Sequence, residues 1–548
     1  MMRRFIFQNL RKLFRRKDDA SGKEIFSGIP PQALLKTYER DYWWSDKWDP
    51  MDHGKNYDFS RPFFEQIREL MNVVPFPSRD FFNLVNSDYC NSCADLKNCY
   101  LCFDSDDIEN SAYIMGGEVA KECFDLFSVR HGELCYDGYM IDKAFRVFFS
   151  VNCEECTDVW FSRNLYGCSN CFGCVNLRGK SYYIYNKPVS KDEYQSFISK
   201  FQSGSSLKIS EERLRAIDFW RTFPMRFTLA IRAINSTGEH IESSRNLKLC
   251  YSVHECENLS YCQFGWPPLT DSYDCTSVGA GTSLAYESAN AGLEGSSNVK
   301  FSWNGWPAVS DFEYCIQCHS SSNLFGCVGL QKKSYCIFNK QYSKEDYFLL
   351  REKIIWHMNE MPYVDKGGRV YKYGEFFPPE FSPFAYNETM AQDLFPLAKE
   401  EAEKRGYLWR EPEKRGYKIT KKAKELPDDI KDVDDSILKE TVGCTSCGLA
   451  YRIIPMELAF YRKISLPIPR LCPECRFRER FKFVNPPKWW HAKCQCAGEF
   501  DDRKIYKNVA AHTAHSASDH CPNEFQTSYS SDRLEIVYCE VCYQNEVV

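Results

Sequence analysis

The chain has 548 residues, a net charge of −5 and 28 cysteines. Its length exceeds what one hydrophobic core supports, so we expect roughly three to four domains. The slightly acidic balance excludes a general electrostatic attraction to nucleic acid, and the lack of any apolar run of about 18 residues excludes a membrane-spanning helix.

Abundant cysteine is typical of secreted, disulfide-bonded proteins, but two features favour a reducing compartment. The N-terminal sequence MMRRFIFQNLRKLFRRK lacks the apolar stretch and the small-residue cleavage site of a signal peptide. The last nine cysteines fall largely in C-x-C and C-x-x-C pairs, which indicate metal ligands rather than disulfides. We therefore expect a cytoplasmic protein.

Residues 1–82 are expected to combine a basic helix with an aromatic capping segment. Residues 1–17 carry seven Lys or Arg and no acid, with apolar residues at roughly helical spacing. Such a helix could bind a membrane surface, RNA or an acidic partner, but the simpler interpretation is a first helix with a solvated basic face. The aromatic residues that follow are expected to cap a neighbouring domain, in preference to a carboxylate metal site or a sugar-binding platform: Trp43, Trp44, Trp48, Phe59, Phe63 and Phe64.

Residues 83–203 repeat with a period of twelve, interrupted by one nine-residue unit. A small side chain that returns at this interval predicts a β-solenoid with a narrow interior, whose coils stack one strand spacing apart. Twelve residues are either one very small coil or half of a larger one. The small positions are Ser87, Cys99, Ser111, Cys123, Cys135, Ala144, Cys156 and Cys168.

The stretch that ends this region occurs twice. Phe172–Tyr194 and Phe325–Tyr347 are identical at 14 of 23 positions, at an offset of 153. Each copy leads into an apolar stripe at helical spacing, behind a serine N-cap answered by an acid at the third helical position. The capping pairs are Ser190 with Glu193 and Ser343 with Asp346.

This duplication predicts a mainly β protein with two tandem, parallel β-helix-like solenoids. The first occupies residues 83–203 and the second residues 237–358, each closed by its helix and joined by a linker at 204–236. In the second region the stretch SVGAGTSLAYESANAGLEGSSN is expected to form tight corners.

The solenoid cysteines are interpreted as small buried hydrophobic residues that fill the narrow interior. A disulfide ladder is the first alternative and would require an oxidising compartment. Metal binding by Cys168, Cys171 and Cys174 is the second, although alternate strand residues point to opposite faces.

After a proline-, aromatic- and charge-rich connector at 359–440, residues 441–548 predict a zinc-binding domain of the zinc-ribbon or treble-clef type. Cys444-x-x-Cys447 and Cys472-x-x-Cys475 supply the four thiolates that a structural zinc ion prefers. Such an ion stabilises domains that are too small for a sufficient core.

A second cysteine set follows, and we expect about two structural Zn²⁺ ions in all. The simplest second shell is Cys494, Cys496, Cys539 and Cys542, with Cys521 as a substitute for one of the close pair. Nitrogen could also come from nearby histidines, although histidines in so polar a loop are more often exposed to solvent. These are His512, His515 and His520.

The segment CTSCGLAYRIIPMELAFYRKISLPIPRLCPECRFRER resembles the probable zinc-ribbon family. More broadly, the chain resembles uncharacterised cysteine-rich repeat proteins of candidate-phyla bacteria over most of residues 35–548, in WWSDKWD, DFSRPFFEQ, the NCY-type repeats, KSYYIYNK and VYCEVCYQNEV. Neither resemblance implies an activity. The residues that match the zinc-ribbon pattern are Cys444, Cys447, Gly448, Glu457, Phe460, Tyr461, Pro469, Cys472, Cys475 and Arg476.

A short internal similarity links the two ends of the chain. Val537–Tyr543 resembles Thr37–Trp43 at an offset of 500, and members of the broader family carry a cysteine near the position of Asp18. We therefore hypothesise that the N-terminal segment is a shortened relative of the zinc module that lacks its ligands.

The sequence favours a non-enzymatic zinc-binding scaffold that presents a solenoid surface to a protein partner. A nucleophile elbow, an H-E-x-x-H motif and a nucleotide-binding loop are all missing. A carbohydrate-active β-helix enzyme is an alternative, although no carboxylate pair can be chosen. The other alternative is RNA or DNA binding by basic and aromatic residues of the zinc domain: Arg476, Arg478, Arg480, Lys482, Trp489 and Trp490.

Overall fold

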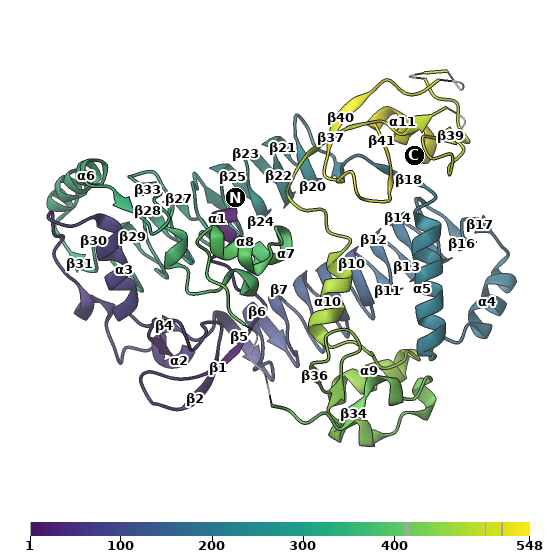
Figure 1. Ribbon diagram of the computed structural model, residues 1–548, viewed down its shortest axis with the longest axis horizontal. Helices are drawn as coiled ribbons and strands as arrows, with labels where there is room; N and C mark the ends of the chain where they lie inside the picture. The colour runs from purple at the N-terminus through teal and green to yellow at the C-terminus, as the bar shows by residue number, and fades with distance from the viewer. Residues whose placement is uncertain (1, 412–415, 499, 514, 517–518) are drawn as a thin grey trace. The chain divides into compact units, whose positions relative to one another are not determined.

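The computed structural model describes residues 2–411, 416–498, 500–513, 515–516 and 519–548. The chain forms two compact units: unit 1 comprises Met1–Asp80 and Thr228–Pro412, and unit 2 comprises Phe81–Phe227 and Glu413–Val548. The six consecutive segments expected from the sequence are thus distributed between two units, each with one solenoid (Figure 1). None of the described helices is long and apolar enough to cross a membrane.

The solenoid of unit 2 is a stack of short parallel strands, with an antiparallel closure at its end. Paired positions in neighbouring coils are twelve residues apart, as in Phe124↔Tyr136 and Tyr136↔Phe148. Twelve residues are therefore one complete coil. The strands are β5 (Phe81–Val85), β6 (Asn91–Lys97), β7 (Phe103–Asp106), β8 (Met115–Glu118), β9 (Phe124–Arg130), β10 (Tyr136–Asp142), β11 (Phe145–Phe148), β12 (Val151–Glu154), β13 (Thr157–Trp160), β14 (Arg163–Tyr166), β15 (Ser169–Phe172), β16 (Ser181–Ile184) and the antiparallel β17 (Lys187–Pro188).

Within each coil the backbone turns at every third residue. These corner residues have positive φ, the left-handed conformation that Asn and Asp tolerate better than most residues. Asn152 and Asn164 occupy the same corner of adjacent coils, and the Asn152 amide donates to Asn164 Oδ1 at 3.0 Å. The coil is thus a small four-sided loop with three residues on each side.

One residue of each side points inward, so the interior is lined at every third position. The buried residues there are mostly Cys, Leu, Ile, Val and Ala. Their thiols also satisfy backbone carbonyls: the sulfur of Cys168 lies 3.4 Å from both Tyr166 O and Leu177 O. The unit of nine residues in the sequence pattern is not a shorter coil, because residues on either side of its end still pair twelve apart, as in Tyr136↔Phe148. Nine residues correspond to three of the four sides of a coil.

We predict that this interior is limited by size. Cys171→Phe should lower the free energy of unfolding by about 1–3 kcal/mol, because extra carbons overpack a close-packed core. Cys171→Ser should cost less than this, because Ser162 and Ser150 occupy equivalent inward positions with their hydroxyl groups bonded. Chemical unfolding of the full chain would measure both, and equal costs would contradict the prediction.

The solenoid of unit 1 has the same design with less regular coils. Paired residues are eleven to fourteen apart, as in Ala230↔Ile241, Gly238↔Cys250, Cys256↔Leu269 and Ser283↔Ser297. The extra residues form corners in the small-residue stretch: a Cβ on Gly279 would lie 1.9 Å from Trp266 O, so only glycine fits. The strands are β19 (Ala230–Ile231), β20 (Gly238–Glu242), β21 (Arg245–Lys248), β22 (Cys250–His254), β23 (Cys256–Ser260), β24 (Gln263–Gly265), β25 (Leu269–Tyr273), β26 (Thr282–Ser283), β27 (Ser297–Lys300), β28 (Ser310–Glu313), β29 (Ser322–Phe325), β30 (Ser334–Ile337) and β31 (Lys340–Gln341).

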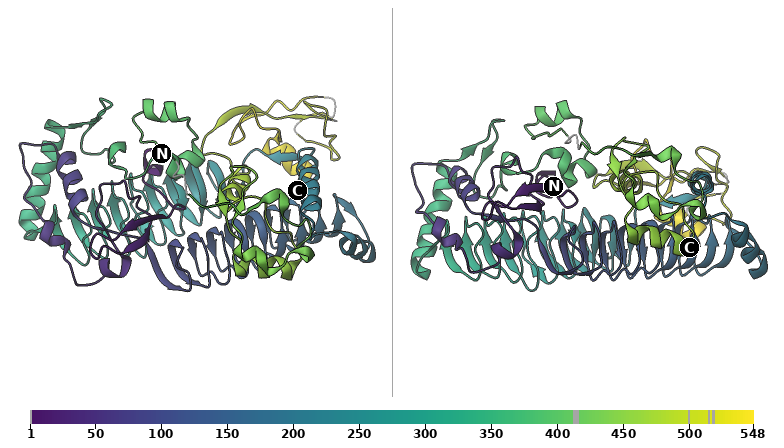
Figure 2. Two further views of the ribbon diagram at one scale, coloured as in Figure 1. Left: turned by 60° about the horizontal axis from the view of Figure 1, so that its bottom comes forward. Right: turned by 90° about the horizontal axis from the view of Figure 1, so that it is seen from below.

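Each solenoid is followed by the predicted helix, and both N-caps are confirmed. Helix α4 (Lys191–Lys200) begins after Ser190, which forms a reciprocal capping box with Glu193. Helix α6 (Lys344–Glu360) begins after Ser343, which accepts from the backbone N–H of Asp346. The coils of each unit stack in sequence up to these ends (Figure 2).

The segment expected as a linker contains a helix that packs within unit 2. Helix α5 (Ser206–Trp220) begins where Ser206 N donates to Asp428 O at 2.9 Å, and it ends with Trp220 Nε1 donating to Phe161 O at 3.1 Å. Strand β18 (Pro224–Arg226) then pairs in parallel with β41 (Ile536–Tyr538). Helix α5 is therefore anchored at both ends.

The N-terminal segment of unit 1 does not form the expected basic helix. Helix α1 covers only Met2–Phe5, and Phe14–Lys17 form strand β1, paired with β2 (Glu24–Ser27). Arg4 does not lie on a solvated basic face, because it is 1% exposed and pairs with Asp274 and Glu287.

The aromatic segment packs against the solenoid of unit 1 as expected. Helix α3 (Phe63–Val73) places Phe63 against Phe325 and Phe338, and Trp43 lies 5.5 Å from the ring of His319. The remaining elements are α2 (Arg40–Trp43), β3 (Thr37–Tyr38), β4 (Phe76–Pro77), β32 (Tyr363–Val364), β33 (Val370–Tyr371), α7 (Met390–Leu394) and α8 (Lys399–Lys404) in unit 1, and β34 (Lys421–Lys422), β35 (Val442–Gly443), β36 (Ala450–Tyr451), α9 (Pro455–Ile464), α10 (Pro473–Phe481), β37 (Trp490–Lys493), β38 (Cys496–Ala497), β39 (Phe500–Asp501), β40 (Glu524–Thr527) and α11 (Glu540–Val547) in unit 2.

Candidate metal centres

The first cysteine set comes together as predicted. Cys444 and Cys447 lie in the turn between β35 and β36, and Cys472 and Cys475 lie at the start of α10. All four sulfurs are within 4.8 Å of one another, and Cys447 Sγ is 3.7 Å from Cys472 Sγ. A tetrahedron with Zn–S bonds of about 2.3 Å has edges of about 3.8 Å, whereas a disulfide would need about 2.0 Å. The donor set therefore fits a tetrahedral metal ion.

The backbone around this group favours the thiolate form of Cys444. Burial raises the pKa of Cys444, but backbone N–H groups of Cys447, Cys472 and Ser446 outweigh it and lower the pKa to about 7. Cys472 N lies 3.3 Å from Cys444 Sγ. Because metal binding requires deprotonated sulfur, these N–H groups prepare the site for a cation.

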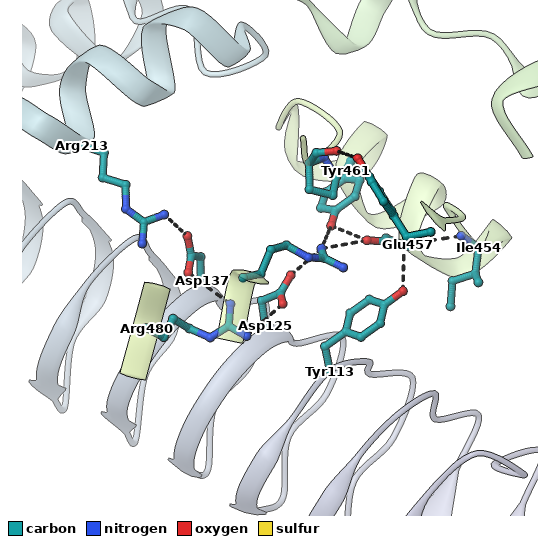
Figure 3. A network of polar contacts seen from close by, with 11 residues as sticks. Tyr113, Asp125, Asp137, Arg213, Ile454, Glu457, Tyr461 and Arg480 are labelled. Carbon is teal, nitrogen blue, oxygen red and sulfur yellow. Dashed lines mark hydrogen bonds and ion pairs between the residues drawn. The ribbon is translucent and has the colours of Figure 1, made fainter. Parts of the chain in front are cut away.

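The segment between the two cysteine pairs attaches this group to the solenoid of unit 2. Arg476 Nη1 bonds to Asp125 Oδ2 at 2.7 Å and to Glu457 Oε1 at 2.9 Å, and Tyr113 OH donates to Glu457 Oε2 at 3.1 Å. Figure 3 shows Tyr113 pointing from the coils toward Glu457, and Arg480 lying beside Asp125 and Asp137.

Two features of this network explain residues of the zinc-ribbon-like pattern. Phe460 stacks on Phe124 at 4.2 Å, and Glu457 is fully buried. Arg480 pairs with Asp125 at 3.0 Å and with Asp137 at 3.3 Å. Three of the pattern residues that are not ligands, Glu457, Phe460 and Arg476, therefore serve as contacts between the cysteine group and the coils.

This network also revises the candidate nucleic-acid surface. Arg476 and Arg480 are 6% and 2% exposed and are held by carboxylates, so neither can meet a phosphate. Arg478 and Lys482 are exposed, but they pair with Glu474 and Glu479. Trp490 is half-buried in β37, with Trp489 before it.

The second cysteine set separates into two overlapping groups rather than one. Cys494, Cys521, Cys539 and Cys542 form a group of four buried sulfurs within 4.8 Å of one another. Cys521 Sγ lies 3.8 Å from Cys539 Sγ, again the edge of a zinc–sulfur tetrahedron. Cys521 thus belongs to the all-sulfur group, in the place that the sequence interpretation gave to Cys496.

The other group combines Cys496 and Cys542 with His512 and His515. Cys496 Sγ lies 3.3 Å from His512 Nδ1 and 3.2 Å from His515 Nε2, and Cys542 Sγ lies 3.5 Å from the same His515 nitrogen. A tetrahedral zinc ion with one Zn–S and one Zn–N bond has a sulfur–nitrogen edge of about 3.5 Å. These four atoms fit such an ion.

The expectation that the loop histidines face solvent is therefore revised for two of the three. Only His520 remains exposed, where it pairs with Asp502 at 2.8 Å. Sequence spacing gave no reason to separate these histidines. The useful signal is H-x-x-H spacing in one loop whose ends are both fixed by cysteines.

The N-terminal segment has the strand–helix frame of this module without its cysteines, as the short similarity suggested. Strands β1 and β2 correspond to β37 and β40, which also pair antiparallel, and β3–α2 corresponds to β41–α11. Asp18 takes the place of Cys494: Asp18 Oδ1 accepts from Glu39 N at 3.0 Å, and Cys494 Sγ accepts from Cys539 N at 3.1 Å.

The correspondence extends upstream, where the sequence reading missed it. RFIFQN at 4–9 aligns with RFKFVN at 480–485. Arg4 pairs with acids of two successive coils in unit 1, and Arg480 does the same in unit 2. The chain therefore contains two copies of the same arrangement. In each, a helix carries an arginine that pairs with acids of two successive coils and so attaches a small module to the solenoid.

No family model and no curated protein matches the chain. Among solved structures, it is similar to a chain described as a "putative acetyltransferase" from Desulfovibrio desulfuricans G20, at 13% identity over 49% of this chain and 69% of that chain, with a TM-score of 0.11. A similarity this low carries no functional argument.

Proposed function

We propose that the protein is a non-enzymatic zinc-binding scaffold that presents β-solenoid surfaces to a protein partner. The observation that carries the proposal is the dual role of α10. The helix begins at Cys472 of the first metal group, and one turn later it offers Arg476 to Asp125 of the solenoid. An ion bound by four thiolates would fix this helix in place and leave no coordination position for a reacting water.

The solenoid of unit 1 offers an example of a surface suited to a protein partner. Tyr261, Tyr273 and Tyr286 follow one another along successive coils, with ring centroids 5.3 and 5.8 Å apart. Tyr273 is 45% exposed and Tyr286 is 36% exposed. Aromatic rings fixed in a row bury a large area on binding and lose little entropy.

The test is the metal content of the purified full chain. We expect zinc in the chain as purified, and Cys444→Ser with Cys472→Ser should remove one ion, because a thiolate shell with two ligands missing no longer closes. The matched control is Cys168→Ser with Cys171→Ser in the solenoid, which should leave the zinc content unchanged. A chain without zinc, or an equal loss from the control, would contradict the proposal.

Nucleic-acid binding through the exposed part of the basic segment remains a separate prediction. Phosphate contacts would make the affinity fall steeply with salt. Arg478→Gln with Lys482→Gln should then weaken binding to unrelated single strands, with zinc content as the control. No binding of the full chain at low salt would reject it.

A further inference from the structure

Cys542 belongs to both metal groups of the C-terminal module. It is fully buried in the first turn of α11, directly after β41. Its sulfur lies within 4.8 Å of the sulfurs of Cys494, Cys521 and Cys539, and also within 4.8 Å of the Cys496 sulfur and the nitrogens of His512 and His515. One sulfur atom therefore faces two sets of three donors.

We propose that residues 494–542 hold two metal ions joined by the thiolate of Cys542. This inference rests on the proposed zinc binding and raises the expected count from about two ions per chain to three. Cys494, Cys521 and Cys539 complete the shell of one ion, and Cys496, His512 and His515 complete the shell of the other.

Both shells close only if the sulfur is shared. A thiolate has enough lone pairs to bind two cations, and with it each ion has four protein ligands, the number that structural zinc requires. Five thiolates and two neutral imidazoles around two divalent ions also leave only one net negative charge. If Cys542 bound one ion alone, the other would keep three ligands and an open position.

The environment of the histidines supports metal ligation independently of the distances. His512 directs Nδ1 at Cys496, while its Nε2 lies 3.4 Å from Glu546 Oε2, with the two side chains 3% and 0% exposed. His515 directs Nε2 at both cysteines, and its Nδ1 bonds to Ser516 O at 2.9 Å. An acceptor on the far nitrogen holds each ring in the tautomer whose near nitrogen can bind metal.

Glu546 is itself held firmly in position. It accepts from Val509 N at 2.7 Å and from Ala510 N at 3.0 Å, and Tyr506 OH also donates to it. The carboxylate thus ties the histidine-bearing loop to α11, the helix that carries Cys542.

The N-terminal copy of the module separates the roles of the two ions. There, hydrogen bonds of Asp18 replace the all-sulfur group, and only Asp19 and Ala20 lie between Asp18 and Ser21. The C-terminal module instead has a long loop between Cys494 and Cys521, which carries Cys496, His512 and His515. The all-sulfur ion therefore occupies the position at which the N-terminal copy has the hydrogen bonds of Asp18. The second ion is bound by the loop that is found only in the C-terminal copy.

The full-length protein, loaded with zinc, tests the proposal directly. We expect three zinc ions per chain and a metal–metal component in the zinc X-ray absorption spectrum. Two ions that share one sulfur with Zn–S bonds of about 2.3 Å must lie less than about 4.6 Å apart. Two zinc ions per chain, or three without the metal–metal component, would overturn the shared centre and leave zinc binding intact. No zinc would overturn both proposals.

Variants assign the ligands. His512→Ala with His515→Ala should remove one zinc and abolish the metal–metal component, while the two all-sulfur sites remain. Cys542→Ala should remove two, because each shell loses a ligand. His520→Ala is the matched control and should change nothing, since His520 pairs with Asp502 at the surface. Loss of only one zinc from Cys542→Ala would show that the sulfur serves one ion and would overturn the proposal.

Discussion

Replacing Asp125 by alanine should lower the free energy of unfolding of unit 2 by about 3–5 kcal/mol. The Asp125 side chain is 0% exposed and pairs with Arg476 at 2.7 Å and Arg480 at 3.0 Å. Without it, the two buried guanidinium groups lose their shared counter-ion and keep only Glu457 and Asp137, so the cost of burying them is less well offset. Chemical unfolding of the full chain would measure the loss.

The control for Asp125→Ala lies on the same helix. Arg478 is 63% exposed and pairs with Glu474 within its own helix, so Arg478→Ala should change stability by less than about 1 kcal/mol. Hydrogen exchange should also show earlier opening of α9 and α10 in Asp125→Ala. Adding Arg476→Met should recover part of the loss, because it removes one of the two guanidinium groups that lost Asp125 as a counter-ion. Equal effects of Asp125→Ala and Arg478→Ala would contradict the assignment.

The solenoid could be predicted from the sequence because its interior admits only small or branched side chains. Ser87, Cys99 and Ser111 return every twelve residues because they line the same side of successive coils. The shorter period of three was hidden, because the other sides accept Leu, Ile and Val as readily as Cys. The period of three is clearer at the corners, where every third residue has positive φ and Asn and Asp are frequent.

The first metal group could be predicted because both cysteine pairs are local motifs. The ligands of the other groups could not be predicted, because they come from residues that are distant in the sequence and meet only in the folded chain. Cys496 lies two residues after Cys494, but its sulfur faces His512 and His515. In a continuous strand the two cysteines would share a face, but β37 ends at Lys493 and β38 begins at Cys496, so the chain changes direction between them. Spacing cannot reveal which side a distant histidine approaches.

The basic segments were misread at both ends of the chain for one physical reason. Arg4 and Arg480 look like surface cations in sequence, since arginine is rarely buried unless it is paired. Their partners, Asp274 and Asp125, are distant in sequence and sit at solenoid corners. An arginine that occurs twice with the same neighbours, as in RFIFQN and RFKFVN, indicates an internal contact shared by the two modules rather than a ligand-binding surface.

The N-terminal module should depend on Asp18, which stands in the place of the ligand Cys494 of the proposed metal site. Asp18 is 2% exposed and accepts from the backbone N–H groups of Ala20, Ser21 and Glu39. Asp18→Ala leaves these donors without their acceptor, so it should lower the free energy of unfolding of unit 1 by about 3 kcal/mol. Asp41→Ala, at an exposed ion pair with Arg40, is the control and should cost less than about 1 kcal/mol.

The same group gives this module a dependence on pH. Burial raises the pKa of Asp18, but the hydrogen bonds from Ser21, Ala20 and Glu39 outweigh it, so the pKa in the folded state lies below its usual range. The contribution of Asp18 to stability is therefore complete above about pH 4, the pKa of an unfolded aspartate. It is lost as the pH falls through the lower pKa of the folded state. Unfolding free energies measured from neutral to acid pH should fall more steeply in the parent protein than in Asp18→Ala, and parallel curves would contradict the role assigned to this carboxylate.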